Sequence, residues 1–126
     1  HHADEFQQWP IFETAASEPM VQDTMVLLGD AGHGMTPFAA QGGAMAIEDA
    51  AVLAKCLART ENIKEALKTF EMTRLPRLKK VRNLAARNAT INHLTGPAAL
   101  ARNAALSLMP SASFTKQLNW LYGWRA

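Results

Sequence analysis

Apolar and polar positions divide the first half of the chain into a strand, a loop and a helix. The continuous apolar run Met25–Leu28 predicts a short strand buried on both faces, as in a parallel sheet covered by helices. The stretch Gly29–Gln41 mixes glycines with polar residues and is expected to form a loop. From Gly43 to about Arg59 the residues are apolar on nearly every helical face, which predicts a buried helix.

The second half is predicted to be helical, with interruptions at proline and glycine. Apolar residues three and four positions apart predict one helix over Ile63–Arg74 and another from Arg77 to about Leu94. Pro76 is expected to break or kink the chain between them, because proline removes a helical hydrogen bond. Two further helices are predicted over Ala98–Leu108 and Ser113–Leu121.

The N-terminal stretch is less regular. Glu5–Glu13 suits an edge strand or an extended segment, since Pro10 disfavours a central strand. Thr14–Gln22 is polar and is expected to be a connector. The fold class predicted from the pattern is therefore mostly α with one or two short strands. Because one strand cannot make a sheet, we expect any sheet partners to lie outside these residues.

Composition narrows the class of protein. The chain has 126 residues, of which 48% are hydrophobic and 19% charged, so it is expected to be globular. No apolar run reaches the length that spans a membrane, and no membrane partner is expected. Cys56 is the only cysteine, which excludes an intramolecular disulfide and favours a reducing compartment. With no signal-peptide pattern at the start, we expect a cytoplasmic protein.

Charge is distributed unevenly. All 11 acidic residues lie between Asp4 and Glu71, whereas residues 72–126 hold 9 Lys or Arg and no acid. Such a segment binds an anion or faces acidic protein surface. One alternative function is therefore a non-enzymatic helical module that uses the basic face Lys64–Arg87 to bind an acidic protein or nucleic acid. Phe70 is the only aromatic residue in that stretch, so we expect no stacking platform and no nucleic-acid partner.

The residues after the predicted strand suit a polar ligand. Asp30 follows the strand directly, where its carboxylate could accept hydrogen bonds from the hydroxyls of a ribityl or ribose chain. It could equally be an N-cap or Asx-turn residue that organises the loop. Gly42 and Gly43 begin the helix, whose first N–H groups lack internal partners and attract negative charge. They could also be ordinary loop glycines. Pro37 is expected to stiffen the loop and leave its carbonyl free to face a ring.

Other chemistries find little support in the sequence. His33 could be a ligand, a base or a hydrogen-bonding loop residue, and we favour the last. No metal site is expected, since there is no His-Glu-x-x-His motif and no second cysteine. No Gly-Lys-Ser/Thr follows the glycines, and no nucleophile elbow is present.

The segment Leu27–Ala50 reads Leu-Leu-Gly-Asp-Ala-x-His, then Pro37, then Ala-Gln-Gly, then Ala-Ile-Glu-Asp-Ala. This pattern resembles the second flavin-contacting motif, or GD motif, of the FAD-dependent aromatic hydroxylases. These are the group A flavoprotein monooxygenases, and the similarity is greatest to enzymes of the salicylate hydroxylase and 3-hydroxybenzoate 6-hydroxylase type. Further similarity lies in Trp9-Pro10, Arg74-x-x-Arg77, His93–Pro97, Ala101–Asn103 and Trp120–Trp124.

The resemblance implies a fold and an activity. The chain would be the C-terminal part of an α/β FAD-binding fold of the p-hydroxybenzoate hydroxylase type. Residues 1–22 would end a substrate-domain strand and its connector, 23–60 would form the GD-motif strand, loop and helix, and 61–126 the C-terminal helical region. The enzyme would be an oxidoreductase that hydroxylates an aromatic small-molecule acid with FAD, NADH or NADPH, and O₂.

The resemblance also implies the site residues. The flavin would be contacted by Gly29, Asp30, Pro37, Gln41, Gly42, Gly43 and Ala44. Asp30 would hold the ribityl chain, and the N–H groups of Gly43 and Ala44 would hold the pyrimidine edge. Pro37 would also lie near the face where oxygen reacts, a catalytic position. Many family members have Asn where this chain has Ala44.

The G-x-G-x-x-G dinucleotide fingerprint of the family is absent from these residues. The resemblance therefore implies roughly the last third of such an enzyme, with its N-terminal part as the partner. We expect the 126-residue chain alone to be inactive. A homodimer anchored by Trp120, Tyr122 and Trp124 is a further alternative.

Overall fold

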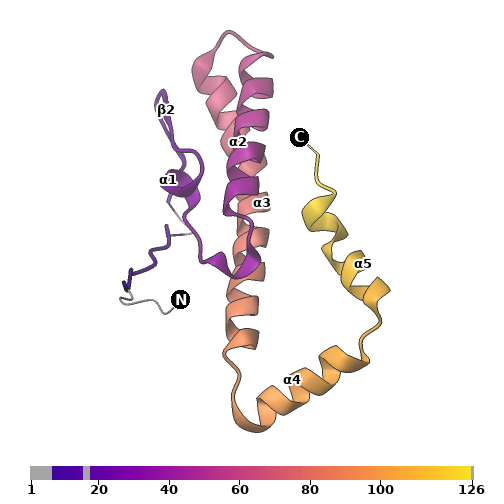
Figure 1. Ribbon diagram of the computed structural model, residues 1–126. Helices are drawn as coiled ribbons and strands as arrows, with labels where there is room; N and C mark the ends of the chain where they lie inside the picture. The colour runs from indigo at the N-terminus through magenta and orange to yellow at the C-terminus, as the bar shows by residue number, and fades with distance from the viewer. Residues whose placement is uncertain (1–6, 16–17, 126) are drawn as a thin grey trace, which may run out of the picture.

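A computed structural model describes residues 7–15 and 18–125 of the chain. The elements in chain order are β1 (Val21–Gln22), β2 (Met25–Val26), α1 (Asp30–His33), the 3₁₀ turn η1 (Pro37–Ala39), α2 (Gly42–Leu57), α3 (Ile63–Asn92), α4 (Gly96–Leu108) and α5 (Ser111–Tyr122). Figure 1 shows α2 and α3 running antiparallel side by side, with α4 leading away from the end of α3 and α5 turning back. The prediction of a mostly helical chain with short strands is confirmed.

The predicted strand is one arm of a small hairpin. β1 and β2 pair antiparallel, with Val21 opposite Val26 and Gln22 opposite Met25. Glu71 of α3 fixes this hairpin, because its carboxylate accepts the Met20 N–H at 2.8 Å and the Val21 N–H at 3.1 Å. The expectation of a strand buried on both faces is wrong for the described residues, since Met25 is 64% exposed. A two-stranded hairpin that packs against one helix buries only the face that contacts this helix.

The segment predicted to be a loop contains two short helical turns. α1 and η1 form within Gly29–Gln41, so the loop prediction is wrong in detail. At the N-terminus, Glu5–Glu13 was expected to be an edge strand or an extended segment. Residues 7–13 form no strand, and Glu5 and Phe6 lie outside the described residues.

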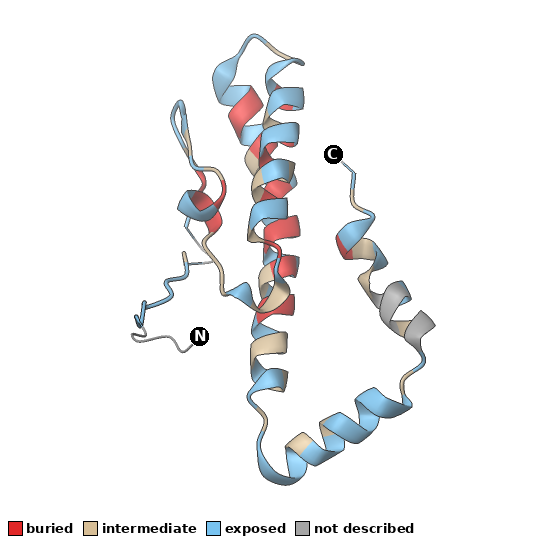
Figure 2. Ribbon diagram, viewed as in Figure 1, coloured by how far each residue is buried: buried red, intermediate tan, exposed pale blue. Residues whose placement is uncertain are grey.

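The helix α2 is buried along one stripe only. Its buried residues are Met45, Asp49, Val52 and Cys56, whereas Ile47 on the opposite side is 73% exposed. Figure 2 shows the buried residues gathered where α2 faces α3. The prediction of burial on nearly every face is therefore wrong within the described part of the chain, since a helix packed mainly against one neighbour buries one stripe.

The helix α3 is continuous for 30 residues, about 45 Å. Pro76 lies inside it, so of the two alternatives expected there the break is wrong, and a kink stays a prediction. Pro76 and Met72, whose carbonyl loses its helical partner, are both exposed, and water can therefore satisfy that carbonyl. On the buried side of the helix, Arg74 and Arg77 are fixed by ion pairs to α2.

The last two helices differ in packing. The helix α4 has no buried residue, and Gly96 and Pro97 are its first two residues. Proline suits a first turn, where its missing N–H costs nothing. The helix α5 contacts the core through Leu121, which is buried.

The core lies between α2 and α3 and extends to the hairpin and α5. Its buried apolar members are Met20, Met45, Val52, Cys56, Ala66, Phe70, Leu78, Val81, Leu84 and Leu121. In the part of the chain that the structure describes, we find no helix with both the length and the apolar character needed to cross a membrane.

Candidate cofactor site

A glycine with positive φ connects the hairpin to the site. Gly29 is buried with φ at 57°, a conformation that glycine adopts without strain. A Cβ added here would lie 3.3 Å from the Cβ of Ala46, so the backbone approaches α2 closely. Gly29 thus places α1, and with it Asp30, beside the start of α2.

Asp30 is the first residue of α1 and its side chain is exposed. Its Oδ1 lies 3.6 Å from the point that a Cβ on Gly42 would occupy, which puts the carboxylate at the N-terminus of α2. Gly29, not Asp30, is the N-cap of α1, and no side chain caps that helix. The reading of Asp30 as a capping residue is therefore not supported.

The first turn of α2 is open. Gln41 precedes the helix and is buried, and its carbonyl accepts the Met45 N–H at 2.9 Å. No side chain caps this helix, and Gly43 and Ala44 are exposed. A Cβ built on Gly43 would meet nothing within 4 Å. The first N–H groups of a 16-residue helix therefore face accessible space.

Pro37 begins the turn η1 and is exposed. Its carbonyl accepts the Ala40 N–H at 2.9 Å, so the expectation of a free carbonyl is wrong. The turn is attached to α3, because the Asn88 side chain donates to the Phe38 carbonyl at 3.0 Å and the Phe38 ring meets His93 edge-on. Pro37 therefore lies on a turn that contacts from α3 hold in place.

A depression of about 420 Å³ adjoins the Asp30 carboxylate. Part of its wall is the N-terminal segment, which is pinned to the end of α1 by reciprocal bonds between Thr14 and Gly34. The Thr14 N–H donates to the Gly34 carbonyl and the Gly34 N–H to Thr14 Oγ1, both at 3.0 Å. Phe12 and Met35 add apolar surface to the same wall. The carboxylate thus stands beside space that a polar chain could enter.

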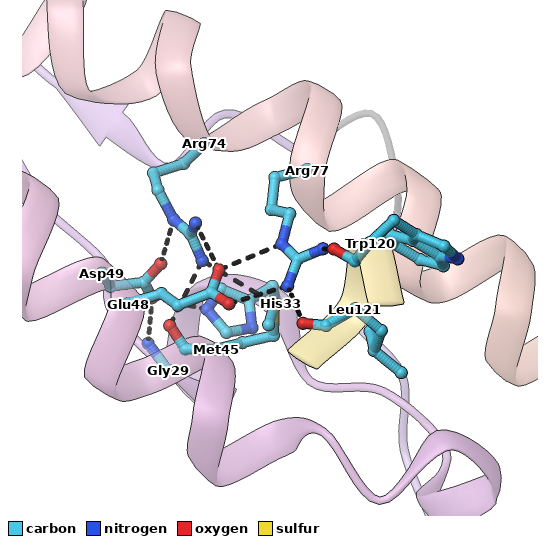
Figure 3. A network of polar contacts seen from close by, with 9 residues as sticks. All are labelled: Gly29, His33, Met45, Glu48, Asp49, Arg74, Arg77, Trp120 and Leu121. Carbon is cyan, nitrogen blue, oxygen red and sulfur yellow. Dashed lines mark hydrogen bonds and ion pairs between the residues drawn. The ribbon is translucent and has the colours of Figure 1, made fainter. Parts of the chain in front are cut away.

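Beneath this surface lies a buried polar network that the sequence motifs did not predict as a unit (Figure 3). Asp49 of α2 is fully buried, and its Oδ2 contacts His33 Nε2 at 2.5 Å and accepts the Gly29 N–H at 3.0 Å. Its Oδ1 accepts from Arg74 Nε at 2.8 Å. His33 is thus a hydrogen-bonding residue, as favoured from the sequence, but it is buried and ends α1 instead of lying in a loop.

The network continues from α2 through α3 to α5. Arg74 and Arg77 both donate to Glu48, Arg74 through Nη1 at 2.8 Å and Arg77 through Nη2 at 2.8 Å and Nε at 3.1 Å. Arg77 also donates to the carbonyls of Trp120 at 3.0 Å and Leu121 at 2.8 Å. Two carboxylates and two guanidinium groups balance one another in charge, as buried ions require.

Burial alone would raise the pKa of Asp49. The hydrogen bonds from His33, from the Gly29 N–H and from Arg74 outweigh that effect and hold the pKa of Asp49 below its ordinary value. Asp49 is therefore a carboxylate at neutral pH, which accepts hydrogen bonds from three directions.

The sequence did contain a signal for this network. Asp49 falls on the stripe Met45, Val52, Cys56 that packs against α3, and an acid at a core position requires a buried partner. Arg74 falls on the corresponding stripe of α3, next to Phe70 and Leu78. An acid and an arginine on facing core stripes predict an ion pair, although only the fold shows that they meet.

The expected basic face of α3 is smaller than the sequence indicated. Arg74 and Arg77 are buried in the network, and Lys64 contacts Asp23 at 3.4 Å. The fold adds an aromatic residue that the sequence count missed, since Lys80 Nζ lies 4.1 Å from the ring centroid of Trp120. Within residues 7–15 and 18–125, no group of three or more His, Cys, Asp or Glu is arranged to hold a metal ion.

The open helix start and the exposed carboxylate fit a flavin nucleotide. A flavin has a polar ring edge, which suits exposed main-chain amides, and a polyhydroxyl chain, which suits a carboxylate acceptor. Both groups lie at one end of α2, and a Cβ on Gly43 would occupy the free space there.

The sequence is similar to those of known hydroxylases and monooxygenases. The chain is 36% identical over 125 residues to 3-hydroxybenzoate 6-hydroxylase 1 of Aquipseudomonas alcaligenes, covering 98% of this chain and 32% of that protein. It is 34% identical over 123 residues to 3-amino-4-hydroxybenzoate 2-monooxygenase of Streptomyces cremeus, covering 96% of this chain and 30% of that protein. Aurachin C monooxygenase/isomerase of Stigmatella aurantiaca is 49% identical over 57 residues, 45% of this chain and 15% of that protein.

The chain therefore spans about a third of the length of the first two relatives. Residues 1–85 match the FAD binding domain family. This match and the relatives together confirm the resemblance to the FAD-dependent aromatic hydroxylases and the expectation of FAD as the cofactor. The chain belongs to the FAD binding domain family.

Proposed function

We propose that this chain is the C-terminal, flavin-contacting portion of an FAD-dependent monooxygenase that hydroxylates an aromatic acid. The observation that carries the proposal is the pairing of Asp30 with the open start of α2. Among the described residues, the Asp30 carboxylate has no hydrogen-bond or ion-pair partner, yet it lies next to uncapped N–H groups. A charged group without a structural task, beside unpaired donors, suits a ligand.

Each site residue has a distinct task in this proposal. Asp30 accepts hydrogen bonds from hydroxyls of the ribityl chain. The N–H groups of Gly43 and Ala44 bind the pyrimidine edge, where the positive end of the helix favours the negative charge of a reduced ring. Gln41 and Gly42 supply the close backbone approach at the helix start, and Gly29 sets the turn. Pro37 provides a rigid wall beside the ring, near the face where oxygen reacts.

When bound, FAD accepts reducing equivalents from NADH or NADPH and activates O₂ for transfer to the aromatic substrate. The relatives are named as hydroxylases and monooxygenases of aromatic acids, which supports this class of reaction. We further propose that residues 1–22, 23–60 and 61–126 serve as the end of a substrate domain, the GD-motif unit and a C-terminal helical region. The residues that complete the cofactor site belong to an N-terminal part of the same enzyme.

FAD titration of the purified chain tests the proposal. The Asp30→Asn variant keeps the size of the side chain and removes its charge. Because Asp30 is exposed and unpaired among the described residues, we expect unchanged stability and a roughly tenfold weaker affinity for FAD, the loss of one charge-assisted hydrogen bond. Asp23→Asn is the control, an exposed aspartate of the hairpin turn whose carboxylate contacts Lys64 and not the start of α2.

Equal affinity of both variants for FAD would refute the role of Asp30. The 126-residue chain is expected to bind FAD weakly and to show no turnover, and a tight stoichiometric complex with a red-shifted, quenched flavin spectrum would refute the proposal that a further part is needed. A homodimer remains a prediction. Trp120 and Trp124 pack against the chain's own core, which leaves the exposed Tyr122 as its anchor.

A further inference from the structure

The buried carboxylate of Asp49 contacts both ends of α1. Its Oδ2 accepts the N–H of Gly29, the N-cap of α1, at 3.0 Å. The same oxygen contacts Nε2 of His33, the last residue of α1, at 2.5 Å. Between these two contacts lies Asp30, the exposed carboxylate of the candidate site.

A helix as short as α1 does not persist without outside support. It has four residues and few internal bonds, of which His33 N–H to Gly29 O at 2.9 Å and Gly34 N–H to Asp30 O at 3.0 Å close the turn. Isolated helices below about 12 residues are marginal in water. The conformation of α1 therefore depends on contacts from the rest of the fold, and Asp49 supplies one at each end.

Asp49 is itself fixed and inaccessible. Arg74 Nε donates to its Oδ1 at 2.8 Å, and Arg74 Nη2 donates to the Met45 carbonyl at 3.3 Å. Both Asp49 and Arg74 are fully buried. Asp49 therefore touches no ligand, and any effect on binding must pass through α1.

Asp49 and the open helix start belong to the same helix, α2. The same helix begins at Gly42, so one rigid element carries both the open N–H groups and the carboxylate that holds α1. Besides the close approach of Gly29 to Ala46 and the bonds between Thr14 and Gly34, one buried side chain two turns into that helix therefore helps to fix the distance from Asp30 to the helix start.

We propose that Asp49 is a positioning residue of the flavin site, which holds α1 so that Asp30 faces the start of α2. This inference rests on the proposed function for its ligand, but its structural part is measurable without FAD. Glu48 provides the matched control, since it is the neighbouring carboxylate, also binds Arg74, and has no bond to α1.

Amide hydrogen exchange on the 126-residue chain tests the structural part. In Asp49→Asn we expect exchange at Gly29 and His33 to accelerate at least tenfold relative to Glu48→Gln. If Asp49→Asn does not fold, His33→Leu removes one of the two α1 contacts and leaves Asp49 paired with Arg74. It should loosen the C-terminal end of α1 alone. Equal exchange at α1 in the Asp49 and Glu48 variants would overturn the inference, as would unchanged exchange in His33→Leu.

FAD affinity tests the positioning part through a double-mutant comparison. If Asp49 acts through Asp30, Asp49→Asn weakens FAD binding about tenfold, and the double variant Asp30→Asn/Asp49→Asn binds no more weakly than Asp30→Asn alone. Additive losses would overturn the inference while leaving the proposed function intact. A parent chain with no detectable FAD binding would overturn the proposed function and the ligand role of Asp49 with it, whereas the exchange result would still report whether Asp49 holds α1.

Discussion

Replacing Arg77 with methionine is expected to detach α5 from the rest of the chain. The guanidinium of Arg77 makes two bonds to the Glu48 carboxylate and one each to the carbonyls of Trp120 and Leu121. Its carbon also lies 5.3 Å from the ring centroid of Trp120. Methionine keeps most of the apolar length of the side chain but none of these polar bonds.

The magnitude follows from the burial of the pair. Arg77 and Glu48 side chains are 7% and 14% exposed, so water cannot replace the lost partner fully. Breaking a buried ion pair by removing one partner costs about 3 to 5 kcal/mol. Glu48 retains Arg74, which limits the loss, and we expect a decrease of about 3 kcal/mol in the free energy of unfolding.

Urea denaturation measures this change. With a slope of about 2 kcal/mol per molar urea, the midpoint should fall by about 1.5 M. Tryptophan fluorescence and the far-ultraviolet helix signal should both follow this shift, and fluorescence reports on α5 directly because that helix carries Trp120. Arg87→Met is the control, an exposed arginine of α3 with no partner among the described residues, and should shift the free energy by less than about 0.5 kcal/mol. Equal midpoints for the two variants would show that the Arg77 bonds contribute nothing to the docking of α5.

Two further predictions concern Asp49 and Gly43. The pKa of Asp49 is lower in the folded chain than in the unfolded chain, so its stabilisation is complete above the unfolded pKa of about 4 and is lost as the pH falls through the folded pKa. Urea midpoints from pH 7 to pH 3 should therefore fall less steeply in Asp49→Asn than in the parent chain, and parallel curves would contradict the assignment. Gly43→Ala should raise stability by about 0.5 kcal/mol, because a Cβ there meets nothing and alanine favours helix, while weakening FAD binding by filling the approach to the ring. Calorimetry with and without FAD separates the two effects, and tighter binding by the variant would count against a flavin at this helix start.

Local sequence patterns predict where most of the helices lie, but they do not predict which elements pack against each segment. The stripe of apolar residues in α3 was visible in the sequence, and so was the helix after Gly42. The break predicted at Pro76 does not occur in α3. Pro76 is exposed, so water can replace the helical hydrogen bond that the proline removes. The burial of Met25–Leu28 was overestimated, since an apolar run shows what a segment could bury but not which elements cover it.

In the candidate site, too, the sequence predicts some residues, whereas only the fold reveals the role of others. Asp30, Gly42 and Gly43 could be singled out because their chemistry depends on neighbours in the sequence. The role of Asp49 could not, since it depends on Arg74, 25 positions away, and on a turn that was expected to be irregular. The expectation of a free carbonyl at Pro37 is wrong for a local reason, because that carbonyl accepts the Ala40 N–H within a tight turn.

The absence of buried residues in α4 affects how the chain unfolds locally. It buries no residue along its 13 positions, a length at which a lone helix in water is barely stable. At its junction with α3, Arg102 donates to the carbonyls of Ile91 and Asn92 at 2.8 and 3.2 Å. Unwinding of α4 therefore costs a small part of the global unfolding energy, so a protease should cut between residues 96 and 108 before it cuts within the packed helices α2 and α3. The severed α5 would then remain attached only through its contacts with the arginines and the core.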